Sequence, residues 1–391
     1  MTYFLQDIVR QPRELRRTIE HLCGAGEGEL RAAVKAVQNA SNVYLTGIGS
    51  SWHAAQAAAP LFQMAGFPVV VQDASELLQF TTFPPASAVI AISRSGRSTE
   101  ILSLLAKARG SSTTVIAITN SPEGPLAREA PISIVIPIEL DHAVSVNTYS
   151  TLAAAAAIVA RSVVGSFDSD LSASLLVSLA ETAQRIPDWQ AQIVENQWFA
   201  PAEATYFLAR GSSLGSCHEA RLLWEEAAKS PASAMGTGSF RHGPQEIVNG
   251  GIRFGLWMDG LRLRDQDFSV ASDLRSLGAS LMLIGQDLPG DTAGLVFQLP
   301  RIAADWQFLI DIIPAQLVAE AMARRTGVDC DSFRICSYIV EGEYGLREKV
   351  ASCISQSARE AGRGTAEVNR RNGSTAEGDA VVIRHDNLEA R

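Results

Sequence analysis

The stretch Ala88-Val89-Ile90-Ala91-Ile92-Ser93-Arg94-Ser95-Gly96-Arg97-Ser98-Thr99 joins an apolar run to a run of hydroxyl side chains. The apolar half is uninterrupted, which is typical of a strand covered on both faces in a parallel sheet. Residues 100–108 then have the pattern of a helix. A loop between a strand and a following helix exposes free N–H groups and the positive end of the helix dipole. The stretch therefore predicts a site for a small phosphorylated ligand, with a hydroxyl-rich helix cap as the alternative.

Segments typical of strands and helices alternate on both sides of this stretch. Strands are predicted at 43–46, 69–71, 114–119 and 134–138, and helices at 52–64, 74–80 and 150–164. The pattern restarts with predicted strands at 205–210, 254–257, 281–284 and 295–297, and a helix at 305–324. In each half the first strand runs into a Gly-Ser-Ser tripeptide, at 49–51 and 211–213. The sequence thus predicts an α/β protein with two copies of a parallel sheet flanked by helices.

The same pattern divides the chain into five segments. We predict an N-terminal helical segment at 1–35, a first α/β domain at 36–168, a helical connector at 169–198, a second α/β domain at 199–345 and a flexible tail at 346–391. Pro12 is expected in the first turn of an N-terminal helix, where proline is tolerated. The tail is polar and rich in Glu, Arg, Ser and Gly, a composition that does not support a packed core.

Composition excludes several classes of function. The 391 residues are 47% hydrophobic and 19% charged, as in ordinary globular proteins, and the net charge of −9 argues against a nucleic-acid partner. The five cysteines are scattered and show no metal-ligand spacing, so we expect no metal, no cofactor and no disulfide framework. The amino terminus lacks the pattern of a signal peptide, and no apolar run is long enough to span a bilayer. We therefore expect a cytoplasmic protein without a membrane partner.

Hydroxyl side chains follow two strands that we expect to be neighbours. Ser50 and Ser51 follow the first strand, while Ser93, Ser95, Ser98 and Thr99 follow the strand at 88–92. Open α/β sheets bind ligands where two such strand ends meet. The hydroxyls and the free backbone N–H groups there suit a phosphate monoester. For Ser50 and Ser51, helix capping is the alternative.

Two glutamates lie on the predicted helix after residue 213. Glu219 and Glu226 are seven positions apart, so they share a helix face with the apolar Leu222 and Leu223. Apolar surroundings disfavour a charged carboxylate and raise its pKa, which suits a general base near neutral pH. A solvated helix edge is the alternative.

A histidine stands in the stretch Phe240-Arg241-His242-Gly243-Pro244. It precedes Gly-Pro, which places it on a turn, and it follows the glycine- and serine-rich run 236–239, which leaves room for a ligand. His242 is thus a candidate acid–base residue, and a solvated loop histidine is the alternative.

Together these motifs resemble the double-SIS (sugar isomerase) family. Residues 1 to about 345 are similar to the isomerase half of glucosamine-6-phosphate synthase, and to stand-alone aminosugar-6-phosphate deaminases/isomerases and fructosamine-phosphate deglycases. The Ser-Arg-Ser-Gly-Arg-Ser-Thr loop is shared by most SIS domains. Glu226 placed sixteen residues before His242 is more specific to this branch. The resemblance implies two tandem SIS domains, each a flavodoxin-like three-layer fold.

The resemblance also implies roles for individual residues. Ser93, Arg94, Ser95 and Ser98 fall where the family binds the sugar phosphate, Ser51 on a ligand-contacting serine, and Val144 on a backbone contact. Glu226 falls on the base that moves a proton between C1 and C2, and His242 on the ring-opening histidine. The family's histidine comes from the partner subunit, so a homodimer is implied. With Ser50, Thr99 and Glu219 these residues form the predicted site.

Two substitutions separate this sequence from the synthase pattern. Tyr338 stands where the synthase has its Schiff-base lysine, and a phenol cannot form an imine. Leu223 replaces a second lysine near the base and should desolvate Glu226. The chain also begins at the isomerase half, so glutamine is not expected as the nitrogen donor.

We therefore expect an enzyme that isomerises or deaminates an aminosugar 6-phosphate. A fructosamine-phosphate deglycase and a plain aldose–ketose phosphosugar isomerase remain alternatives, because they share the proton transfer. A regulatory module that binds a sugar phosphate without turnover is an alternative of another class.

Overall fold

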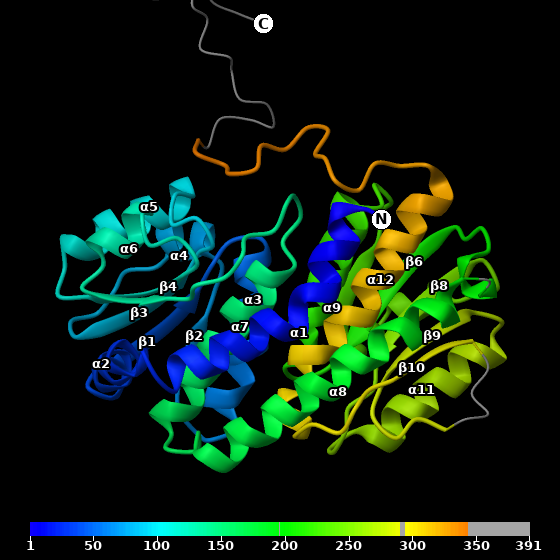
Figure 1. The fold of residues 1–391 in the computed structure, drawn as a ribbon, viewed down its shortest axis with the longest axis horizontal. Coiled ribbons are helices and arrows are strands. Elements are labelled where there is room, and N and C mark those ends of the chain that lie inside the picture. Colours follow the sequence, from blue (N-terminus) through cyan, green and yellow to red (C-terminus); the bar gives the residue numbers. More distant parts are fainter. Residues whose placement is uncertain (195, 290–293, 343–391) are drawn as a thin grey trace, which may run out of the picture. The chain divides into compact units, whose positions relative to one another are not determined.

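The computed structural model describes residues 1–194, 196–289 and 294–342, which form one compact unit with two parallel sheets (Figure 1). The predicted α/β class is confirmed. The predicted flexible tail at 346–391 lies outside the described residues. The boundaries of the five predicted segments stay predictions.

The first sheet contains the apolar strand that was predicted at 88–92. Its strands are β1 (Asn42–Thr46), β2 (Val70–Val71), β3 (Ser87–Ile92), β4 (Thr114–Thr119) and β5 (Ile132–Val135). They pair in parallel in the order β2-β1-β3-β4-β5. Helices α3 (Ser50–Gln63), α4 (Ala74–Phe80), α5 (Thr99–Arg109), α6 (Pro125–Glu129) and α7 (Asn147–Val163) connect and cover the strands. β5 ends before the predicted 138, because Pro137 has no N–H for the ladder.

The second sheet repeats this topology. Its strands are β6 (Ala204–Ala209), β7 (Ser233–Gly236), β8 (Ile252–Trp257), β9 (Ser280–Gly285) and β10 (Leu295–Gln298). They are parallel in the order β10-β9-β8-β6-β7, which is the order of the first sheet read from the opposite edge. Its helices are α9 (Ser213–Glu226), α10 (Thr237–Phe240), α11 (Arg264–Ser276) and α12 (Phe308–Thr326). The predicted duplication is thus present in the fold.

Three further helices belong to neither repeat. They are α1 (Tyr3–Leu22), α2 (Glu27–Gln38) and the connector α8 (Ser169–Ile193). Helix α1 begins earlier than expected, so the placement of Pro12 in a first turn is wrong. Thr2 caps the helix instead, because its side chain accepts the Leu5 N–H at 3.1 Å. Pro12 then lies buried inside the helix and removes one of its hydrogen bonds.

One hydrophobic core joins the two sheets. Alternate residues of β3 face opposite sides: Ala88, Ile90 and Ile92 belong to the shared core, and Val89 and Ala91 to a separate cluster with α4 and α5. Trp257, Met282 and Ile284 of the second sheet belong to the same shared core. Helices α1, α3, α7, α9 and α12 lie between the sheets (Figure 1). The carboxyl end of β3 is therefore held close to helix α9.

Candidate functional site

The loop at 93–98 is a turn closed by its own hydroxyls. The Ser93 hydroxyl accepts the Gly96 N–H at 3.1 Å, and the Ser95 hydroxyl accepts the Arg97 N–H at 3.2 Å. Gly96 has a φ of +62°, and a Cβ on it would lie 2.9 Å from the Leu126 Cβ. The position therefore requires glycine for both reasons.

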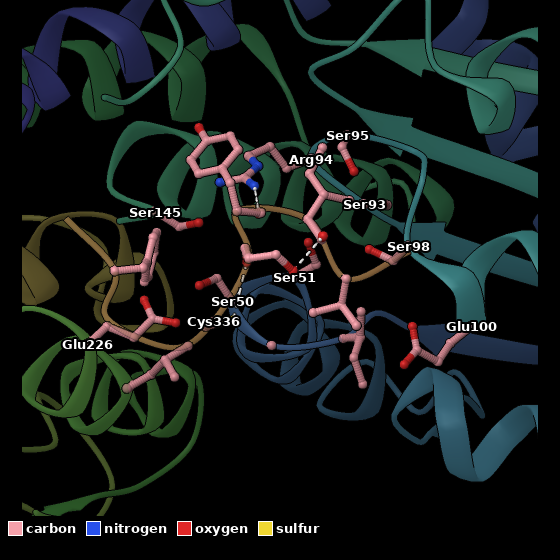
Figure 2. Close-up of a pocket in the computed structure, with 18 residues that line it drawn as sticks. Ser50, Ser51, Ser93, Arg94, Ser95, Ser98, Glu100, Ser145, Glu226 and Cys336 are labelled. Carbon is pink, nitrogen blue, oxygen red and sulfur yellow. Dashed lines mark hydrogen bonds between the residues drawn. The ribbon is translucent and has the colours of Figure 1, made fainter. Parts of the chain in front are cut away.

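This loop borders a cavity at the junction of β1 and β3, where the strand order of the first sheet reverses. The cavity has a volume of about 240 Å³. Figure 2 shows Ser50 and Ser51, from the start of α3, between the loop and Glu226. The lining residues are Ile48, Gly49, Ser50, Ser51, Ser93, Arg94, Ser95, Ser98, Glu100, Ser145, Leu222, Glu226, Phe333, Cys336, Ser337, Tyr338, Ile339 and Val340.

Glu226 is the last residue of helix α9 and faces this cavity. Burial raises the pKa of its carboxyl to about 7, and the neighbouring Glu219 raises it further, while Arg94 and Lys229 oppose the shift. The upward direction agrees with the prediction from sequence. A carboxyl group with a pKa near 7 is half ionised at neutral pH and can both take and return a proton.

The segment 333–340 forms a wall of the cavity, and it includes Tyr338, which the resemblance places where the synthase has its Schiff-base lysine. The Arg94 guanidinium lies 3.9 Å from the centre of the Tyr338 ring and donates a hydrogen bond to the Tyr338 carbonyl at 2.7 Å. The Tyr338 hydroxyl donates to the Asp141 carbonyl at 3.1 Å. The first N–H of helix α5, on Thr99, donates to the Val340 carbonyl at 3.2 Å. The phosphate-loop candidate is therefore covered by this segment.

The structure brings seven of the predicted site residues to the cavity and leaves four outside its lining. Ser50, Ser51, Ser93, Arg94, Ser95, Ser98 and Glu226 line it. Thr99 uses its N–H for Val340, and Val144 is buried next to the lining residue Ser145. His242 is exposed on the turn between α10 and Pro244–Ile247, and its N–H donates to the Ser239 carbonyl.

Glu219 is not among the residues that line the cavity, and its contact with substrate stays a prediction. Its side chain is fully buried and turned toward helix α3, where its Oε2 lies 2.7 Å from His53 Nδ1. Burial raises the pKa of Glu219 to about 8 and lowers that of His53 to about 3. Burial thus disfavours the charged form of each group, and a hydrogen bond joins Glu219 Oε2 to His53 Nδ1. His53 escaped notice because it stands alone in an alanine-rich helix.

Known proteins share this fold and part of the sequence. Residues 36–161 match the SIS domain family. The chain is also 26% identical over 351 residues to the glutamine–fructose-6-phosphate aminotransferase (isomerizing) of Symbiobacterium thermophilum. That match covers 85% of this chain and 58% of the relative, so the chain spans little more than half of the relative's length.

Solved structures of known proteins superimpose on most of the chain. The C-terminal domain of glucosamine-fructose-6-phosphate aminotransferase from Francisella tularensis matches with a TM-score of 0.75 and 22% identity, over 85% of this chain and 98% of that one. Glucosamine-6-phosphate deaminase from Thermotoga maritima matches with a TM-score of 0.73 and 19% identity, over 87% and 99%. The fold is therefore the SIS fold, and the resemblance to double-SIS sugar isomerases holds along the chain.

The second half of the SIS fold fills the corresponding loop with its own carboxylates. After β8, the Asp259 carboxylate accepts the Arg262 and Leu263 N–H groups at 2.6 and 2.5 Å. Asp267 accepts the Asp259 N–H at 3.1 Å and binds Arg210 at 2.7 Å. The second half thus closes this loop with carboxylates, whereas the first half closes its loop with serine hydroxyls.

Two absences hold for the part of the chain that the structure describes. No helix there is both long and apolar enough to cross a lipid bilayer. No group of three or more His, Cys, Asp or Glu side chains there is arranged to hold a metal ion. The expectation that the protein needs no metal stays a prediction.

Proposed function

We propose that this protein is an enzyme that isomerises and deaminates an aminosugar 6-phosphate. One observation carries the proposal: Glu226, a carboxyl group with a pKa near 7, faces the same cavity as the hydroxyl-rich loop Ser93–Ser98. A base and an anion site in one small cavity suit proton abstraction from a phosphorylated sugar. The match to the SIS domain and the likeness to sugar-phosphate enzymes support the same class.

The phosphate of the substrate would bind at the loop end of the cavity. The hydroxyls of Ser51, Ser95 and Ser98 can donate to phosphate oxygens, and the start of helix α5 adds the positive end of its dipole. Arg94 supplies a positive charge at the rim. The sugar would then extend toward Glu226.

The chemistry needs no imine between enzyme and substrate. Once the sugar ring is open, Glu226 takes the C2 proton, the C–H electron pair forms the C1–C2 double bond, and the π pair of the C1 carbonyl moves to O1, which takes a proton from water. Return of the proton from Glu226 to C1, with loss of an N–H proton to water, gives an imine at C2. Water adds to that imine, and the sum is aminosugar phosphate plus water giving ketose phosphate plus ammonia. Tyr338, which stands where the synthase has its lysine, is thus compatible with this route.

Ring opening is assigned to His242 of a partner subunit in a homodimer. In one chain His242 is exposed and does not line the cavity, so this role needs a second copy. Mixing Glu226→Gln and His242→Ala subunits tests the arrangement. Random pairing would restore about a quarter of wild-type activity, because half the dimers are mixed and each contains one intact site. No restored activity would place both residues in the same subunit's site.

Ammonia release tests the proposal itself. Wild type is expected to release ammonia from glucosamine 6-phosphate or galactosamine 6-phosphate, and Glu226→Gln to lose at least ~100-fold in kcat. Equal rates in the two proteins would overturn the mechanism. Turnover of non-amino sugar phosphates without ammonia would indicate a plain isomerase. Turnover of phosphorylated fructosamines would indicate a deglycase.

A sugar-phosphate-binding module without turnover is the second candidate. It is favoured by the segment 333–340, which already occupies the Arg94 guanidinium and the Thr99 N–H. A rise in melting temperature with phosphosugars, together with no turnover of any of them, would support this candidate.

A further inference from the structure

Helices α3 and α9 meet in the core with almost no space between them. Gly215 of α9 lies against α3, and a Cβ on it would be 2.6 Å from the His53 carbonyl oxygen. The two helices carry opposite walls of the cavity, since α3 begins with Ser50 and Ser51 and α9 ends with Glu226. Any shift between α3 and α9 would therefore change the distance between the loop end of the cavity and the base.

A buried hydrogen bond between His53 and Glu219 joins helices α3 and α9. His53 Nδ1 and Glu219 Oε2 are 2.7 Å apart, the Glu219 side chain is fully buried, and His53 is 5% exposed. In the part of the chain described, Glu219 Oε1 has no hydrogen-bond partner. His218 stacks on His53 with the ring centres 5.8 Å apart. The Ser50 side chain, also on α3, is a second hydrogen-bond partner of Glu219. A buried carboxyl group depends on its few partners for its orientation.

We propose that the His53–Glu219 hydrogen bond positions Glu226, because it ties α9 to α3 and keeps a second carboxyl group beside the base. Glu219 lies seven residues before Glu226 on α9, and the two carboxyls interact. His53 and Glu219 do not line the cavity, so the role proposed for them is to act through Glu226. The role in turnover rests on the function proposed above.

Other charged and titratable groups also face the two carboxyls. Around Glu219 they are His53, Arg221, Asp141 and Tyr149, and around Glu226 they are Glu225, Arg94, Lys229 and Cys336. Arg221 is paired with Glu225 at 2.5 Å, which limits its effect on Glu219. Arg94 and Lys229 both lower the Glu226 pKa. A second carboxyl beside Glu226 is the charged neighbour that raises it most.

The test is a titration of Glu226 that needs no substrate. Carbon-13 labelled glutamate reports each carboxyl by NMR, and the Glu226 signal is the one missing from Glu226→Gln. In the wild type we expect a midpoint near pH 7. In Glu219→Gln we expect it to fall by roughly one pH unit, because the like group is gone. An unmoved midpoint would overturn the proposal.

A second pair of variants tests the proposal in case Glu219→Gln does not fold. His53→Leu removes the partner of Glu219, whereas His53→Asn keeps a short polar group at the same place. We expect the Glu226 titration to change in His53→Leu and to return toward wild type in His53→Asn. Identical curves in all three proteins would overturn the proposal. Failure of every phosphosugar to turn over would refute the proposed function and leave this titration result intact.

Discussion

The Arg94 guanidinium stacks on the Tyr338 ring at 3.9 Å and donates to the Tyr338 carbonyl at 2.7 Å. These contacts hold one cation of the loop at 93–98 against the wall 333–340. They also fix the position from which the Arg94 charge lowers the Glu226 pKa. Tyr338 thus has a structural role, although it cannot supply an amine.

Removing the Arg94 charge should move the pH dependence of turnover. Arg94 lowers the Glu226 pKa, so Arg94→Met should raise it, and a base must be ionised to act. The acidic limb of the kcat profile should therefore shift to higher pH, and more activity should be lost at pH 6 than at pH 8. Arg97→Met, an exposed arginine of the same loop, is the control. A shift of the same size in both variants would contradict a specific effect of Arg94.

Separating helices α3 and α9 should impair stability and turnover together. In Gly215→Ala the new Cβ would lie 2.6 Å from the His53 carbonyl oxygen and 2.8 Å from the Ala57 nitrogen. We expect the free energy of unfolding to fall by about 1–3 kcal/mol and kcat to fall as Glu226 moves. Gly28→Ala in α2, where a Cβ would meet nothing within 4 Å, should instead gain up to ~1 kcal/mol. Denaturant unfolding compares the two, and an unchanged Gly215→Ala would refute the tight crossing.

Asp311 should make stability depend on pH. It is fully buried in α12, accepts the Ser213 hydroxyl at 2.6 Å, and burial raises its pKa from 3.8 to about 7. Between pH 4 and 7 the unfolded chain has lost this proton while the folded chain keeps it. The free energy of unfolding therefore falls by up to roughly 1.4 kcal/mol for each pH unit between pH 4 and 7.

Asp311→Asn removes this titration. The stability of the variant relative to wild type should increase as the pH rises from 4 to 7, as measured by denaturant unfolding at several pH values. A constant difference over that range would show that Asp311 is already ionised in the folded protein.

Local sequence patterns predicted the strands and helices that contain an apolar run or an apolar helical face. The run Ala88–Ile92 is apolar along its length, and β3 is buried throughout. The edge strand Ser233–Gly236 and the polar helix Arg264–Ser276 were not predicted, because neither has an apolar run of its own. Strand order predicted that Ser93 lies at the end of the sheet where ligands bind, and the resemblance to the double-SIS family added Glu226 to the same site. Glu219 was assigned to the cavity because helix register alone does not tell which neighbouring helix a side chain meets.

The wall formed by 333–340 could not be predicted from local patterns, because its contacts join residues far apart in the sequence. It contains neither a helix nor a strand, and its contacts with Arg94 and Thr99 join residues more than 200 positions apart. No pattern within the segment encodes such a contact. The same holds for His53 and Glu219, which are 166 positions apart.

The most direct test of the proton transfer is hydrogen exchange at C2 of the substrate. Wild-type enzyme in D₂O with glucosamine 6-phosphate should place deuterium on the sugar carbons C1 and C2, as followed by NMR. Glu226→Gln should place none above background, while the control Ser103→Ala, on the exposed face of α5, should match wild type. Deuterium incorporation by Glu226→Gln at the wild-type rate would contradict the account.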